Sequence, residues 1–301
     1  MKPGLPVWRS LLYVPVNVEK YVEKAHTRGA DCILLDLEDS VPAHEKDNAR
    51  KLVAQNAKRV RRGGADVGVR INRPDAMAPR DLEAAIGVDV NAIQIPKVDD
   101  AAHLRRLDEI VAKLEAKRGL KPGHTRFITM VETPAAFFRM PEIAAAVERT
   151  AAMDIGGEDF ALETGMEPTE DALLMPKQQM IYAARAAGIM PLGYIASVAS
   201  FGDLQAFRRM VKRSRQYGFL GATCIHPSQV TIVNEEYSPS AEEVALAKRV
   251  IEGNAKAAAE GRASFAIDGK MVDVPVVIRA ERLLVRHAAI QAREAAKRAL
   301  S

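Results

Sequence analysis

Residues 126–134 read RFITMVETP, and this stretch holds the pattern on which the fold depends. Its apolar run up to Val131 is typical of a buried strand. Thr133 suits a helix N-cap, and Pro134 suits the first helical position. The stretch therefore predicts a strand that stops at Glu132 and opens directly into a helix. Taken alone, Glu132 could be a charge favoured by the helix dipole, so its meaning depends on how the other strands end.

Seven other apolar segments are each followed by a segment of helical character, at a spacing of about 30 residues. Eight such units predict an α/β fold of the (β/α)₈ TIM-barrel class, which typically takes about 250 residues. An open doubly wound sheet is the alternative, but no G-x-G-x-x-G pattern follows the first strand. The strands are expected at residues 10–16, 32–39, 67–72, 92–98, 127–132, 153–159, 190–195 and 222–226.

Helices are expected between these strands, with a loop from the sixth strand to Pro168. The barrel should span residues 1–237 and form the catalytic domain. Residues 238–301 are too few for an independent domain of usual size, so they predict a C-terminal helical extension that carries a lid loop at 266–275. The helices are expected at residues 18–28, 45–62, after 79, 99–118, up to 149, 169–187, 203–217, from 227, 240–260 and after 275.

The composition excludes several classes of function. A net charge of +4 and a pI of about 9.0, without a basic stripe that carries aromatics, argue against a nucleic-acid-binding protein and suit one that handles small polyanions. Cys32 and Cys224 lie in apolar runs without ligand spacing, which predicts buried thiols and no zinc site. No signal pattern and no apolar run of about 18 residues is present, so a cytoplasmic protein without a membrane segment is expected.

Charged residues gather at the predicted strand ends, which is where TIM barrels place their active sites. A charge beside an apolar strand costs desolvation free energy unless it is paired, so a ring of them calls for one shared explanation. These residues are Asp36, Glu38, Asp39, Arg70, Lys97, Glu132, Glu158, Asp159 and His226.

Glu132 and Asp159 end adjacent predicted strands and could hold a hard cation. Mg²⁺ accepts one or two carboxylates and fills its octahedron with waters and substrate oxygens. Gly156 and Gly157 would allow the backbone to approach closely. These four residues favour a magnesium site at the mouth of the barrel.

A purely structural ring of ion pairs is the alternative, with Arg70 and Lys97 neutralising Glu38 and the two carboxylates. Asp36 points at a strand interior and is expected to be a structural acceptor or a partner of Lys97. His226 either caps or contacts a ligand at the rim, or donates to a backbone carbonyl.

The C-terminal extension adds two acids. Asp268 and Gly269 form a strong turn dipeptide, which explains Asp268 without a functional role. Asp273 stands two residues before Pro275 in an apolar context, and turn chemistry does not explain it.

Eight stretches, in their order and spacing, resemble the citrate lyase beta-subunit-like family of CoA-ester lyases. This family belongs to the Mg²⁺-dependent aldolases that share the phosphoenolpyruvate/pyruvate type of TIM barrel. The resemblance covers about residues 9–285. Two departures are residues 193–203, where many members carry an acid-rich run, and Gly157, where Ala is usual. The matching stretches are residues 9–15, 35–41, 69–72, 95–98, 131–133, 156–159, 225–229 and 268–273.

The resemblance implies that Glu132 and Asp159 bind Mg²⁺, with Mn²⁺ as the other metal to consider, and that Arg70 grips the keto-acid part of the substrate. It further implies that Asp273 is the acid–base group, inserted into the site of a neighbouring subunit in a trimer or hexamer. Glu38 and Asp39 are expected to orient Arg70 or Lys97, or to order a water. The expected substrate-binding residues are Tyr13, Lys20, Lys24, Arg70, Lys97, Glu132, Ile225 and His226.

The implied reaction is a reversible retro-Claisen cleavage of the CoA thioester of a small hydroxy acid, with malyl-CoA and citramalyl-CoA as the leading substrates. The products would be acetyl-CoA and glyoxylate or pyruvate. Three alternatives remain open: a malyl-CoA-type thioesterase that uses the same metal site, a citrate lyase beta subunit that acts on a carrier-bound thioester, and a class II aldolase that works without CoA.

Overall fold

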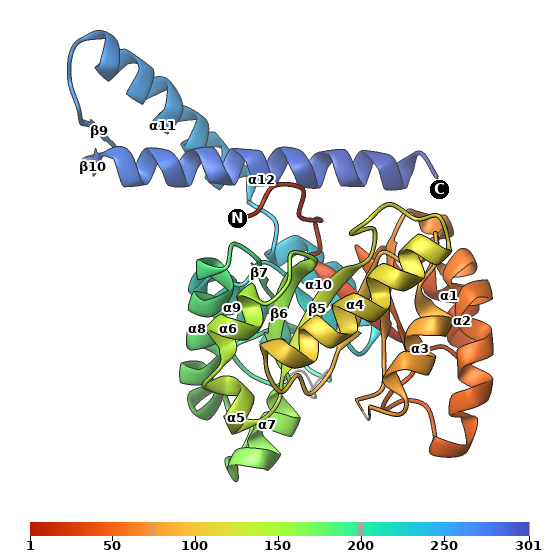
Figure 1. Cartoon of the computed structure of the whole chain (residues 1–301). Coiled ribbons are helices and arrows are strands. Elements are labelled where there is room, and N and C mark those ends of the chain that lie inside the picture. Colours follow the sequence, from red (N-terminus) through yellow and green to blue (C-terminus); the bar gives the residue numbers. More distant parts are fainter. Residues whose placement is uncertain (74, 198–201, 301) are drawn as a thin grey trace. The chain divides into compact units, whose positions relative to one another are not determined.

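The computed structural model describes residues 1–73, 75–197 and 202–300. Eight parallel strands form one sheet in the order β7-β6-β5-β4-β3-β2-β1-β8, and a parallel bridge between Leu192 and Gly221 joins its two edges. Helices surround the closed sheet (Figure 1), so the expected (β/α)₈ TIM barrel is confirmed. The strands are β1 (Ser10–Pro15), β2 (Cys32–Asp36), β3 (Asp66–Arg70), β4 (Ala92–Ile95), β5 (Arg126–Val131), β6 (Thr150–Ile155), β7 (Met190–Pro191) and β8 (Ala222–Cys224).

Side-chain caps start several of the helices where the sequence predicts them. The Thr133, Thr169 and Asp203 side chains accept hydrogen bonds from backbone N–H groups in the first turns that follow them. The helices of the barrel are α1 (Glu19–Ala25), η1 (Ala43–Glu45), α2 (Lys46–Val60), η2 (Arg61–Gly63), α3 (Ala78–Ala85), α4 (Ala101–Lys117), α5 (Pro134–Phe137), α6 (Met140–Ala145), α7 (Gly157–Thr164), α8 (Glu170–Ala186), α9 (Leu204–Tyr217) and α10 (Pro227–Glu236).

Apolar side chains fill both sides of the sheet. A large cluster includes Val53, Leu82 and Leu104, which lie on the helices, together with Val69 and Ile93 on the strands. A smaller cluster lies inside the barrel, and most of its strand members have the opposite parity. Its strand members are Leu11, Cys32, Leu34, Ala92, Ile128, Ala151, Ala152 and Met190.

The sixth strand differs from its predicted bounds in a way that affects the site. It starts at Thr150 and ends at Ile155, and α7 begins two residues later, where the strand was expected to continue to residue 159 and then lead into a loop. Glu158 and Asp159 therefore lie in the first turn of a helix and do not end a strand. Carboxylates are stabilised at a helix N-terminus by the helix dipole, and this preference explains the earlier helix start.

Two other predicted segments are shorter or broken. The helix expected to reach residue 149 is split into α5 and α6, and Pro141 stands in the first turn of α6, where proline is tolerated. The seventh strand keeps only two of its six expected residues. Residues 198–201 of the departing segment 193–203 lie outside the described residues.

The chain divides into two compact units, Met1–Tyr237 and Ser238–Ser301. The second unit contains α11 (Ala241–Ala259), β9 (Phe265–Ile267), β10 (Lys270–Val272) and α12 (Val274–Arg298). The expected loop at 266–275 is in fact mostly a hairpin, because Asp268 and Gly269 both adopt positive φ and form the tight turn that joins β9 to β10. The small core of this unit comprises Ala247, Val250, Val272, Val277 and Ala280.

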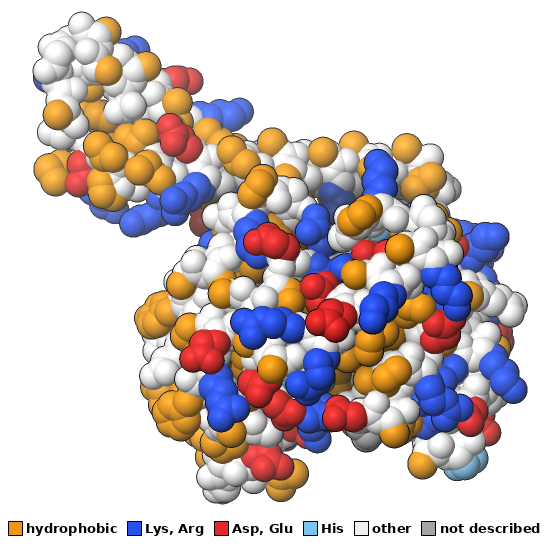
Figure 2. All heavy atoms as spheres, in the orientation of Figure 1, with side chains coloured by type: hydrophobic (Ala, Val, Ile, Leu, Met, Phe, Trp, Pro, Cys, Tyr) orange, Lys and Arg blue, Asp and Glu red, His pale blue; other side chains and the backbone are white. Residues whose placement is uncertain are grey.

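Charge is dispersed over the face of the barrel that Figure 2 shows, where Lys and Arg side chains are interspersed with Asp and Glu side chains. Among the described helices, none has the length and apolar character needed to cross a membrane.

Candidate metal and substrate site

Arg70 ends β3 and gathers three carboxylates around its guanidinium group. The register of β2 against β3 pairs Asp36 with Arg70, and both Asp36 oxygens accept hydrogen bonds of 2.7 Å from it. Glu38 lies 2.9 Å from a terminal nitrogen of Arg70, and Asp39 accepts from the same nitrogen at 3.0 Å. The guanidinium also stacks over the Tyr13 ring, 4.6 Å from its centroid. The structure therefore brings Tyr13, Glu38, Asp39 and Arg70 together.

The carboxyl groups around Arg70 differ in the direction in which their pKa values are shifted. Burial opposes ionisation of Asp36, but hydrogen bonds from Arg70 and the Arg70 charge outweigh it and hold the pKa of Asp36 below its usual value. Burial raises the pKa of Glu38 to about 8, and the Arg70 charge offsets this effect only in part. Arg70 therefore favours the ionised form of Asp36, whereas burial favours the protonated form of Glu38. Asp36, expected as a structural acceptor or a partner of Lys97, is bound to Arg70.

Glu132 follows β5 by one residue and is only 3% exposed. Its Oε2 atom accepts a 2.5 Å hydrogen bond from the backbone N–H of Lys97. Among the described residues, no side-chain nitrogen of Lys, Arg or His lies within 4.0 Å of this carboxylate to form an ion pair. Burial raises the pKa of Glu132 to about 7, the Lys97 N–H lowers it, and the Asp159 charge raises it further. Glu132 is thus a buried carboxylate with no side-chain counter-ion in the described chain.

Gly156 makes room for Glu132. A Cβ atom at this position would lie 2.5 Å from Glu132 Oε1 and 2.7 Å from its Cγ. Any larger residue would therefore displace the carboxylate, and this contact explains why glycine stands between β6 and α7. Gly157 follows as the first residue of α7, which carries Asp159 in its first turn.

Lys97 joins the two candidate metal ligands. Its φ of +45° is unusual for a residue with a side chain, and it directs the backbone N–H to Glu132 while the ammonium lies 2.9 Å from Asp159 Oδ1. The hydrogen bond to Asp159 raises the pKa of Lys97. The structural ring of ion pairs is therefore present at Arg70 and Lys97, but it does not include Glu132.

The residues present fit a magnesium ion. In the described part of the chain, no three His, Cys, Asp or Glu side chains cluster as a complete metal site. Mg²⁺ does not need such a cluster, because one or two carboxylates suffice when substrate oxygens and waters complete the shell. Glu132, buried against Gly156 and influenced by the Asp159 charge, supplies the hard oxygen donors that Mg²⁺ prefers.

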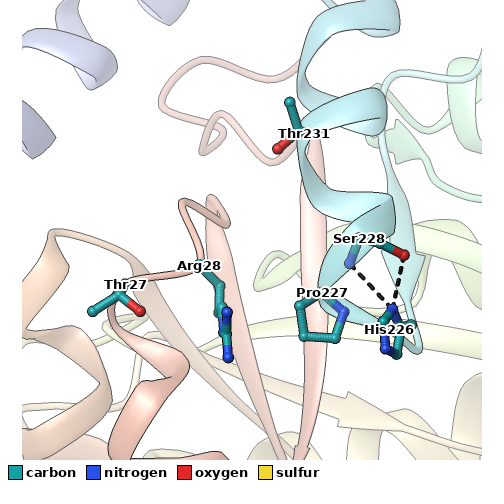
Figure 3. Close-up of a pocket in the computed structure, with 6 residues that line it drawn as sticks. All are labelled: Thr27, Arg28, His226, Pro227, Ser228 and Thr231. Carbon is teal, nitrogen blue, oxygen red and sulfur yellow. Dashed lines mark hydrogen bonds between the residues drawn. The ribbon is translucent and has the colours of Figure 1, made fainter.

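Ile225 and His226 lie at the rim beyond β8. Ile225 is 43% exposed. His226 is the N-cap of α10: its Nδ1 atom accepts from the Ser228 backbone N–H at 3.2 Å and lies 2.8 Å from the Ser228 hydroxyl. Figure 3 shows His226, Pro227 and Ser228 on one wall of a groove, with Arg28 and Thr27 on the other. His226 thus caps a helix beside a polar groove, and its contact with a ligand stays a prediction.

Lys20 and Lys24 are not joined to this cluster by any hydrogen bond or ion pair among the described residues of the barrel. Lys20 and Lys24 are exposed on α1, and the Lys20 ammonium lies 4.9 Å from the Tyr21 ring centroid. Asp273 belongs to the C-terminal unit, where it is the N-cap of α12. Its side chain makes no capping hydrogen bond, so the carboxylate is not used to start the helix.

Two buried charged residues near the site were not predicted from the sequence. Asp154 lies on β6 and is 5% exposed, and burial raises its pKa to about 6. Lys177 lies on α8 and is 3% exposed, and burial lowers its pKa. Asp154 lies within an apolar run, and Lys177 lies four residues after the buried Leu173, on the same helix face. In both cases a charged residue occupies a position where the pattern predicts a buried apolar side chain, and this signal could have identified them.

Comparison with known proteins places this geometry in a family. Residues 9–227 match the family model of HpcH/HpaI aldolase/citrate lyase. The citrate lyase subunit beta of Leuconostoc mesenteroides subsp. cremoris is 33% identical over 279 residues, which are 92% of each chain. The (3S)-malyl-CoA thioesterase of Cereibacter sphaeroides is 34% identical over 288 residues, which are 95% of this chain and 96% of that protein.

A solved structure agrees with these sequence relatives. The CitE protein of Mycobacterium tuberculosis, in complex with magnesium, acetoacetate and coenzyme A, superimposes with a TM-score of 0.75 at 29% sequence identity. The match covers 95% of this chain and 99% of that one. The family match, the relatives and the shared barrel agree: this chain belongs to the HpcH/HpaI aldolase/citrate lyase family.

Proposed function

We propose that the chain is a Mg²⁺-dependent carbon–carbon lyase that cleaves a 3-hydroxyacyl-CoA. The proposed substrates are malyl-CoA and citramalyl-CoA, and the products are acetyl-CoA with glyoxylate or pyruvate. The observation that carries this proposal is the buried Glu132 carboxylate, which has no counter-ion among the described side chains and lies close enough to Asp159 to be influenced by its charge. The magnesium and coenzyme A of the related CitE complex support the choice of cofactor and substrate class.

Glu132 and Asp159 would hold the metal, with Mn²⁺ as a substitute. Mg²⁺ bound there would supply positive charge beside the hydroxyl and carboxylate oxygens of the substrate and so polarise them. Lys97 holds Glu132 through its backbone and Asp159 through its ammonium, so one residue sets the positions of both ligands.

Arg70 would bind the carboxylate of the keto-acid part. The guanidinium stacks on the Tyr13 ring and donates two hydrogen bonds to Asp36. The position of the Arg70 side chain is therefore fixed before substrate binds. The Asp39 side chain is 72% exposed and shares a terminal nitrogen of Arg70 with Glu38. A substrate carboxylate can replace Asp39 on that nitrogen at little desolvation cost, because Asp39 is already hydrated.

Asp273 is the proposed base, contributed by a neighbouring subunit of a trimer or hexamer. It takes the proton of the substrate hydroxyl, and the bond between the hydroxyl-bearing carbon and the α-carbon of the thioester then breaks. The electron pair passes to the thioester as an enolate, and protonation at carbon gives acetyl-CoA. The Asp273 carboxylate suits this role because it makes no capping hydrogen bond to α12.

Two other reactions remain candidates because relatives carry their names. A thioesterase would use the same carboxylates and cleave the thioester with water, in line with the (3S)-malyl-CoA thioesterase relative. A subunit of a citrate lyase would require a carrier-bound citryl thioester, in line with the citrate lyase subunit beta relative.

Product analysis separates these reactions. Purified protein is incubated with malyl-CoA and Mg²⁺, and the products are resolved by chromatography. A lyase yields acetyl-CoA and glyoxylate, whereas a thioesterase yields free CoA and malate. Free CoA and malate as the only products would refute the lyase assignment, and no turnover without a carrier protein would favour the citrate lyase subunit.

A further inference from the structure

Two buried charges flank the end of β6, and the proposed reaction uses neither of them. Asp154 shares the inward face of the barrel with Met130, its partner in the β5–β6 register, which contacts the Tyr13 hydroxyl. Lys177 approaches the same strand end from α8. Among the described residues, no ion pair within 4.0 Å joins Asp154 to a cation, and its Oδ1 atom has no hydrogen-bond partner. The two charges therefore form no direct ion pair, although each shifts the pKa of the other toward its ionised form.

Lys177 contacts the turn that leads to Asp159. Its ammonium donates a 3.2 Å hydrogen bond to the carbonyl of Ile155, the last residue of β6. A Cβ atom at Gly157 would lie 3.3 Å from Leu173 Cδ1 and 3.8 Å from Lys177 Nζ. Leu173 and Lys177 are four residues apart and so share one face of α8. That face packs directly against the turn between β6 and α7.

This turn determines the geometry of the candidate metal site at two points. Gly156 lies against the Glu132 carboxylate, and α7, which starts at Gly157, carries Asp159. A shift of the Ile155 carbonyl would therefore move the wall behind one carboxylate and the helix that bears the other. An apolar side chain would fill the place of Lys177 without the desolvation cost of a buried ammonium, so packing alone does not account for the lysine.

We propose that Lys177 is a positioning residue. Its hydrogen bond to the Ile155 carbonyl holds the β6–α7 turn in the position that allows Glu132 and Asp159 to bind one cation. Asp154 balances its charge from the inner face of the strand. The inference rests on the proposed function, because it concerns the same pair of metal ligands. It assigns a residue on an outer helix to the support of the site, a role that outer partners of metal ligands commonly have.

The test compares variants that separate the hydrogen bond from the charge. Lys177→Met removes both, and Lys177→Gln keeps a donor without the charge. Asp154→Asn combined with Lys177→Met removes both buried charges, and this double variant should fold even where Lys177→Met alone does not. Lys113→Met, at an exposed position of α4, is the matched control. Mg²⁺ affinity is measured by isothermal titration calorimetry, and hydrogen–deuterium exchange is followed at residues 156–162.

We expect Lys177→Met and the double variant to lose about tenfold or more in Mg²⁺ affinity and to exchange faster at residues 156–162, with a smaller loss in Lys177→Gln. Lys113→Met should match the wild type. Unchanged or tighter Mg²⁺ binding in both Met-containing Lys177 variants would overturn the role of Lys177, because loss of a repelling charge alone predicts tighter binding. If the wild type bound no Mg²⁺, the metal assignment would fail, and amide exchange would still decide whether Lys177 fixes the turn.

Discussion

Glu132→Gln should stabilise the metal-free protein above neutral pH, which is the opposite of what loss of a structural ion pair would do. Glu132 is 3% exposed and accepts only a backbone N–H, from Lys97, among the described donors. A glutamine oxygen can accept the same hydrogen bond. The substitution therefore removes a buried negative charge while it keeps the shape and the one observed contact.

The magnitude follows from the pKa of this carboxyl. Burial raises the pKa of Glu132 from 4.5 to about 7, so the folded protein binds this proton more tightly than the unfolded chain does. The contribution to stability is complete below about pH 4.5 and is lost as the pH rises through about 7. Ionisation above that pH then costs on the order of 3 kcal/mol in the free energy of unfolding, and glutamine avoids this cost.

The assay is urea denaturation in EDTA at about pH 5 and about pH 8, with Glu163→Gln, an exposed position on α7, as the control. At the higher pH the Glu132→Gln midpoint should lie above that of the wild type, and near pH 5 the two should approach each other. Added Mg²⁺ should stabilise only the wild type and the control. A Glu132→Gln protein that is no more stable than the wild type at about pH 8 in EDTA would refute the argument from burial.

Three other substitutions test the rest of the site. Asp159→Ala should abolish Mg²⁺-dependent turnover of malyl-CoA and keep the far-UV circular dichroism spectrum, and substantial turnover after chelation would disprove the metal assignment. Asp273→Ala should lose catalysis but keep CoA-ester binding by calorimetry, whereas loss of binding alone would make Asp273 a structural residue. Gly156→Ala places a Cβ atom 2.5 Å from Glu132 Oε1, so we expect a loss of about 1–3 kcal/mol in the free energy of unfolding and weaker Mg²⁺ binding; an unchanged affinity would show that the contact relaxes freely.

The barrel could be predicted because its signals are local. Apolar runs mark the strands, and residues such as Thr133 and Thr169 start the following helices through their own side chains. Local signals alone also led to the wrong prediction that Glu158 and Asp159 end a strand, because acidic residues suit both the end of a strand and the first turn of a helix. The hairpin of the C-terminal unit was missed because strands of three residues are too short to show a period.

The contacts within the site depend on register, which the sequence does not display. Arg70 meets Asp36 because β2 and β3 align those two residues. Lys97 donates its backbone N–H to Glu132 from a position with positive φ, a conformation that the sequence does not reveal. The candidate residues could thus be named from the sequence, but the division of partners between Arg70 and Lys97 required the structure.

The hairpin of the C-terminal unit contacts α11 at two positions. Arg249 donates a two-pronged hydrogen bond to Asp268 in the turn, and the Phe265 ring packs onto Gly253 so closely that a side chain there would clash. The backbone before Asp273 is therefore ordered as part of the folded unit. If Asp273 acts as the proposed base, the conformational entropy of ordering the backbone beside it has already been lost during folding, so this cost would not weaken substrate binding.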